Sequence, residues 1–155
     1  MSENMGRQRA IDLLISVEET AGNLYRRCAR QYPEMGDLWR SMSMSEERHA
    51  QLLREIASDP SEAAGFCERR MFAVNPMRIL LGELRRSVEG LDGPRTSILS
   101  ALEVAREIEN SVLERRVLDP LPGDSATTRQ ELEQLAADTA DHRVLVDRAI
   151  AGLTG

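Results

Sequence analysis

Apolar residues recur at three- and four-residue intervals along most of this chain, which is the spacing of amphipathic helices. The pattern predicts a first helix over about residues 7–32 and a second over about 35–57. Pro33 separates them, because proline lacks an amide donor and disfavours helical geometry in the residue before it. So short a connection implies that the two helices form an antiparallel hairpin.

A second hairpin is predicted near the end of the chain, from helices over about 97–117 and 126–151. Their connection contains Pro120 and Pro122, which remove two backbone donors within three residues and exclude a continuous helix. Between the hairpins, residues 59–95 are long enough to cross the molecule from one end to the other.

This crossover contains a predicted short helix near 61–68 and a longer one over about 77–91. The longer helix has an apolar side of its own, which makes a homodimer a hypothesis. We therefore expect one all-α domain over residues 1–155: an antiparallel four-helix bundle, with hairpins over about 7–57 and 97–151 and a long crossover that holds a short extra helix.

Two polar residues of the second helix interrupt its apolar stripe. Glu46 and His49 lie between Met42 and Leu53 on the same side of the helix, whereas Glu47 points away. Residues three apart are neighbours on a helix, so this carboxylate and imidazole are close enough to share one metal ion. An unpaired buried carboxylate costs several kcal/mol, and a metal cation is the simplest group that would offset it.

The two hairpins carry this chemistry at matching places. His49 follows Glu18 by 31 residues and His142 follows Glu109 by 33, and these are the only two histidines. A single histidine on an apolar face is more often a satisfied core residue than a ligand. Three inward carboxylates would repel one another without a cation, however, so the five residues together favour a metal site.

In these residues the chain resembles the ferritin-like superfamily, and most closely its rubrerythrin-like branch. That site takes one Glu from each of two helices and a Glu-x-x-His from each of the other two. Glu18 in the segment SVEETAGNLY and Glu109 in the segment AREIENSV match the two single carboxylates. The segment SEERH supplies one Glu-x-x-His through Glu46 and His49.

The resemblance spans about residues 8–57 and 97–151, roughly two thirds of the chain, and departs from the family at the second Glu-x-x-His. Thr139 stands where that motif requires a glutamate, three residues before His142. Asp138, four residues before His142, is the candidate substitute for this glutamate. Its side chain is shorter and leaves the helix axis at a different angle.

Helical spacing puts two further residues beside the expected site. Tyr25 follows Glu18 by seven residues, and we expect it to hydrogen-bond to that carboxylate. Arg116 follows Glu109 by the same interval. An inward Arg116 would add positive charge next to the site and weaken the need for a second cation.

A shell of carboxylates and imidazoles suits iron or manganese. The resemblance implies two bridged iron ions that reduce peroxide or oxygen. It also implies an external electron-donor protein, because the four-cysteine iron module of many rubrerythrins is absent. On this interpretation Glu46 and Glu109 are the bridges.

By the same resemblance, Glu18 and His49 are terminal on one ion, while His142 binds the other ion together with Asp138. Thr139 implies a weakly held second ion, or a single-metal protein. The alternatives are a ferroxidase or iron-storage protein, which shares the ligands, and a non-catalytic helical bundle with a vestigial metal site.

Charge and composition narrow the class of protein further. The net charge of −6, and the lack of an arginine-rich face with interleaved aromatics, argue against a nucleic-acid partner. No apolar run approaches about 20 residues, and the N-terminal segment lacks the apolar core of a secretion signal, so we expect a soluble cytoplasmic protein without a membrane span. Cys28 and Cys67 form neither a disulfide framework nor a CxxC metal site, and Cys28 is expected as a buried thiol.

Overall fold

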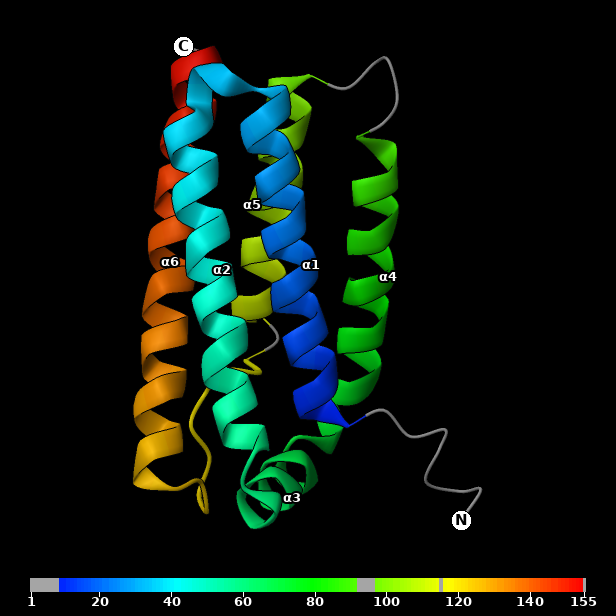
Figure 1. Ribbon diagram of the computed structural model, residues 1–155, viewed down its shortest axis with the longest axis vertical. Helices are drawn as coiled ribbons and strands as arrows, with labels where there is room; N and C mark the ends of the chain where they lie inside the picture. The colour runs from blue at the N-terminus through cyan, green and yellow to red at the C-terminus, as the bar shows by residue number, and fades with distance from the viewer. Residues whose placement is uncertain (1–8, 92–96, 115, 155) are drawn as a thin grey trace.

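The computed structural model describes residues 9–91, 97–114 and 116–154, and over these ranges the chain is helical with no strand (Figure 1). Six α-helices succeed one another: α1 (Ala10–Gln31), α2 (Gly36–Ala57), α3 (Pro60–Arg69), α4 (Val74–Gly90), α5 (Ile98–Glu114) and α6 (Ala126–Thr154). Each corresponds to a helix expected from the apolar periodicity; the expected start of the first, near residue 7, lies outside the described residues. None of the described helices is both long and apolar enough to cross a membrane.

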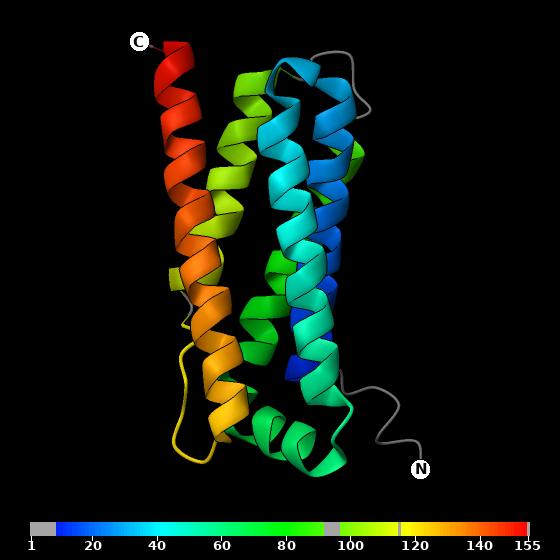
Figure 2. The same ribbon diagram turned by 60° about the vertical axis from the view of Figure 1, so that its left-hand side comes forward.

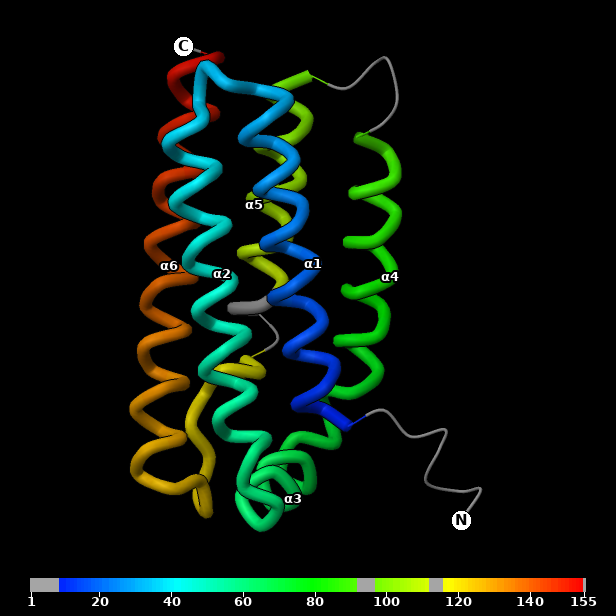
Figure 3. Tube along the Cα trace, in the orientation of Figure 1, coloured from blue at the N-terminus to red at the C-terminus, as the bar shows by residue number. Residues whose placement is uncertain are grey.

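Apart from α3, successive helices run in opposite directions along the long axis of the molecule (Figures 1 and 3). α1 and α2 form one closely packed antiparallel pair, and α5 and α6 form another. α3 lies across the end where α2 finishes, and α4 then carries the chain back beside α1 to the opposite end (Figure 2). This is the path that the length of the 59–95 segment predicted, and it places α2 and α6 antiparallel and in contact.

α1 is packed on two sides, by α2 and by α4. Leu13 and Leu24 are consequently buried together with Leu14 and Tyr25 on other sides of the helix. Cys28 is also buried, and burial raises the pKa of its thiol to about 12, so it remains a neutral apolar side chain. The expectation of a buried thiol at Cys28 is confirmed.

A buried arginine, Arg70, joins the end of α3 to the α5–α6 connection. The Arg70 guanidinium donates to both carboxylate oxygens of Asp124, at 2.6 and 3.0 Å, and to the carbonyl oxygens of Val117 and Asp119. Asp124 also accepts from the Leu121 amide at 2.7 Å. Both side chains of the Arg70–Asp124 pair are inaccessible to solvent. The pair therefore holds the α5–α6 connection in one conformation. The two prolines alone would only prevent this connection from being helical.

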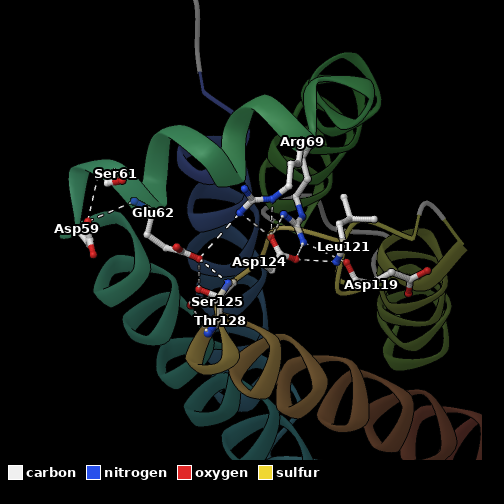
Figure 4. Close-up of polar contacts among 10 residues, drawn as sticks. Asp59, Ser61, Glu62, Arg69, Asp119, Leu121, Asp124, Ser125 and Thr128 are labelled. Carbon is white, nitrogen blue, oxygen red and sulfur yellow. Dashed lines mark hydrogen bonds and ion pairs between the residues drawn. The ribbon is translucent and has the colours of Figure 1, made fainter.

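The start of α6 is held against α3 in the same region. Ser125 caps the helix, because its hydroxyl accepts from the Thr128 amide at 3.1 Å. Glu62 of α3 accepts from the Ser125 amide at 3.2 Å and from the Thr128 hydroxyl at 2.7 Å (Figure 4). Gly123, with φ of +100°, supplies the left-handed backbone that this tight connection requires. These contacts set how α6 begins and hence where its inward residues lie.

Candidate metal centre

Three carboxylates and two imidazoles meet in the interior between the two hairpins. They come from all four long helices of the hairpins: Glu18 (α1), Glu46 and His49 (α2), Glu109 (α5) and His142 (α6). Each of the five residues is at most 6 % exposed. All five residues expected from the sequence are therefore brought together.

Close packing of α1 on α2 places Glu46 in this interior. Gly22 of α1 lies opposite Glu46, and a Cβ at this glycine would be 3.4 Å from the Glu46 Cβ. The Ser43 hydroxyl donates to the Gly22 carbonyl at 2.9 Å, which joins the two helices one turn before Glu46. The sequence pattern did not indicate the role of Gly22, because a single glycine within a helix does not show which neighbouring residue packs against it.

The five residues form two groups that share Glu46. Glu18, Glu46 and His49 offer ligand atoms within 4.8 Å of one another, and so do Glu46, Glu109 and His142. One Glu46 oxygen, Oε2, lies 3.5 Å from Nδ1 of His49; the other, Oε1, lies 3.2 Å from Nδ1 of His142. The two oxygens of one carboxylate thus face two different histidines, which is the geometry of a bridging ligand.

The Nδ1 atoms of the two histidines lie at distances from the carboxylates that suit a shared metal ion. Nδ1 of His49 and Nδ1 of His142 are both buried, and neither has a hydrogen-bond partner among the described residues. Their distances to the nearest carboxylate oxygens are 3.2–3.6 Å. Two atoms that each lie about 2.1 Å from one ion are separated by about 3.0 Å at a right angle and about 3.4 Å at a tetrahedral angle. The donor set therefore fits a metal ion in each group.

The electrostatics of the site are set by burial and by the close carboxylates. Burial, and then the charge of Glu46, raise the pKa of Glu18 well above its ordinary value. Burial alone would lower the pKa of both histidines, but the adjacent carboxylates outweigh it and raise the pKa to about 11 for His49 and about 10 for His142. The raised pKa values favour protonated imidazoles that partly compensate the carboxylates, and a bound cation would replace their Nδ1 protons.

The expected bridges differ in their positions. Glu46 belongs to both groups, as its proposed bridging role requires. Glu109 belongs only to the group with His142, where its Oε1 lies 3.5 Å from the histidine Nδ1. The arrangement therefore favours Glu46 as the bridge and Glu109 as a terminal ligand of the second position.

Asp138 does not take the place expected for it beside His142. Its Oδ2 lies 2.8 Å from Nε2 of His49, on the opposite ring nitrogen from the one that faces Glu18 and Glu46. The reason is the antiparallel contact of α6 with α2: one turn before His142, α6 has reached the level of His49. Asp138 is thus a partner of the first histidine and not a substitute ligand for the second position.

Tyr25 is also bound to a different carboxylate from the one expected. Its hydroxyl donates to Oε1 of Glu109 at 2.7 Å, not to Glu18. Seven residues correspond to about 10 Å along a helix, which is too far for a hydrogen bond to Glu18, so the ring reaches across to α5. Burial and the charge of Glu109 raise the Tyr25 pKa well above its ordinary value, and the phenol keeps its proton.

The expectation of an inward Arg116 is wrong. The structure places Arg116 beyond the end of α5 at Glu114, with a φ of 54° and an 80 % exposed side chain. Its guanidinium pairs with Asp119 at 2.8 Å. Arg116 adds no charge to the centre, because the helical spacing that placed it there does not continue to this residue.

Thr139 does face the interior, but it supplies no ligand. It is buried, and its hydroxyl donates to the Leu135 carbonyl at 2.8 Å within the same helix. The second group therefore lacks the carboxylate that a full Glu-x-x-His would have provided, as the sequence indicated.

The chain matches no protein-family model, no curated protein and no solved structure. The buried Glu and His residues form a cluster that could hold a metal ion, but their arrangement does not identify the metal. The case for a metal centre therefore depends on the geometry of these residues alone.

Proposed function

We propose that this protein is a metal-binding oxidoreductase that holds iron through Glu18, Glu46, His49, Glu109 and His142 and reduces peroxide or oxygen. The observation that carries the proposal is the pair of buried, unpartnered Nδ1 atoms that face separate oxygens of Glu46. Carboxylate oxygens and imidazole nitrogens together suit iron or manganese.

The arrangement of the helices supports a ferritin-like architecture. α1 with α2 and α5 with α6 form two antiparallel hairpins, and α3 and α4 make a long crossover between them. The five candidate ligands project inward from the four hairpin helices, as in ferritin-like carboxylate sites. The site, rather than the fold, supports the proposed function, since one architecture hosts several activities.

Iron, when bound, would supply the electrons for reduction of the substrate. The chain's own residues would bind the metal and keep the protons in place. Tyr25 keeps a proton on Oη, 2.7 Å from Glu109 Oε1, at the edge of the second group. Met42, one turn before Glu46, and Ala105, one turn before Glu109, are inaccessible to solvent, so the sides of α2 and α5 that carry these ligands are shielded from bulk water. An external donor protein would restore the electrons.

A non-catalytic bundle is the second candidate. The raised histidine pKa values favour it, because two imidazolium groups could offset the buried carboxylates without any metal. A ferroxidase or iron-storage protein would use the same ligands and differ in the fate of the oxidised metal, which it would pass on or store.

Metal content and its effect on stability test the proposal. Protein made in medium supplemented with iron and manganese is expected to retain one to two metal ions per chain, with iron in excess. A chelator should lower the thermal unfolding midpoint, because a ligand of the folded state at on the order of 100 times its Kd stabilises by about 2.7 kcal/mol. Metal-free protein whose midpoint is insensitive to chelator would favour the non-catalytic bundle. Peroxide turnover with an added reductant then separates a peroxidase from a storage protein.

Substitution of Thr139 tests whether the second position is incomplete. Three carboxylates against two divalent ions leave one excess positive charge, so Thr139→Glu is expected to raise bound metal toward two ions per chain and to increase peroxide or oxygen reactivity. Thr139→Gln is the matched control, with the same length and no charge. Two equivalent ions already present in the wild type, unchanged by Thr139→Glu, would show that the site is not asymmetric.

A further inference from the structure

The two histidines of the proposed centre differ in what lies behind them. Nε2 of His49 has Asp138 Oδ2 at 2.8 Å, with the Ser45 hydroxyl at a longer 3.4 Å. Among the side chains that the structure describes, the contacts of His142 are with Glu46 and Glu109, both at Nδ1. Each group offers two carboxylates and one histidine, so this difference lies in the support of the histidines and is separate from the carboxylate that Thr139 fails to supply.

We propose that Asp138 is a positioning residue for His49, and that it causes the position formed by Glu18, Glu46 and His49 to fill with metal before the position at His142. The inference rests on the proposed metal centre and deepens it. Asp138 touches no candidate metal position itself and acts only through the imidazole.

The contact fixes which nitrogen of His49 is free to bind. A hydrogen bond from Nε2–H to Asp138 keeps that proton on Nε2, so the proton that a metal displaces is the one on Nδ1, whose lone pair then points toward Glu18 and Glu46. The carboxylate also makes the imidazole a better donor to a cation and fixes the orientation of the ring. For His142 the contacts that the structure describes are with Glu46 and Glu109 at Nδ1, so they do not hold a proton on Nε2 when a metal binds.

Asp138 is itself held in place. Its other oxygen, Oδ1, accepts from Gln134 Nε2 at 3.0 Å, one turn earlier on α6. The Arg48 guanidinium lies 3.8 Å from Oδ2, and the carboxylate is mostly buried, with 17 % of its side chain exposed. The Asp138 carboxylate is thus oriented toward His49 before any metal binds.

Cobalt(II) titration of metal-free protein, monitored by visible absorption and calorimetry, tests the inference. Wild-type protein is expected to bind in two steps of unequal affinity. Asp138→Asn should weaken the tighter step by about 10- to 100-fold and leave the weaker step unchanged, as expected for loss of a supporting carboxylate. Asp138→Glu, which keeps the charge, should recover part of the loss.

Asp141→Asn is the matched control, since it makes the same charge change at an exposed site three residues further along α6. It should leave both steps unchanged. A measurement without metal completes the test: in ¹⁵N spectra of the histidine rings, the protected Nε2–H resonance of His49 should be lost in Asp138→Asn and kept in Asp141→Asn.

Each outcome decides between the inference and the proposed function. Equal weakening of both steps, no change, or a change confined to the weaker step in Asp138→Asn would overturn the positioning role while leaving the metal centre intact. Wild-type protein that binds no cobalt would overturn the metal centre, and the order of filling with it.

Discussion

Substitution of Glu46 by alanine is expected to remove metal from both positions, whereas His49→Ala removes it only from the first. Glu46 is shared by the two groups, and its two oxygens face the two histidines separately. Bound metal should fall from as many as two ions per chain to none in Glu46→Ala. Element analysis of the purified proteins provides the measurement, and the unfolding midpoint of Glu46→Ala should no longer respond to chelator.

Glu47→Ala is the control for this experiment. Glu47 is the next residue of α2, but it is exposed and pairs with Arg26 at 2.9 Å instead of facing the interior. Its substitution should leave the metal content unchanged. If Glu46→Ala kept one ion at full occupancy, Glu46 would not be the shared ligand, and the two positions would have to be independent.

The largest effect on stability is expected from Asp124→Asn, which leaves the guanidinium of Arg70 buried without its counter-charge. Arg70 and Asp124 are both inaccessible to solvent, and removing one partner of such a pair costs about 3 kcal/mol or more. Chemical denaturation should show this loss in the free energy of unfolding at neutral pH. Asp119→Asn is the control, because within the described part of the chain the Asp119 side chain pairs only with the exposed Arg116, so this change should cost far less.

The pH dependence of this difference has a definite sign. Burial of Asp124 acts to raise its pKa, but the hydrogen bonds from Arg70 and the Leu121 amide outweigh it and lower the pKa to about 2 from 3.8. The stabilisation from ionised Asp124 is therefore complete above pH 3.8 and is lost as the pH falls toward 2. The difference in unfolding free energy between wild type and Asp124→Asn should shrink by about 2 kcal/mol over that range. A constant difference down to pH 2 would contradict the lowered pKa.

The sequence by itself determined the helices and the inward direction of the five candidate ligands. Periodicity of 3.6 residues per turn fixes which side of a helix is buried, and Glu18, Glu46, His49, Glu109 and His142 all fall on buried sides. The prolines fixed where the hairpins turn, and the length of the crossover fixed which ends it joins.

Only the tertiary structure decided which inward groups meet. Asp138 contacts His49, and Tyr25 contacts Glu109. These contacts depend on the axial offset and the rotation of each helix relative to its neighbour, which the periodicity of a single helix does not specify. Arg116 lies outside because its helix ends before it. The buried pair of Arg70 and Asp124 joins residues 54 apart whose local sequence resembles any exposed helix end and loop. Helical spacing specifies a direction around one axis, whereas contacts between helices depend on register and helix ends, which the packing of the whole chain sets.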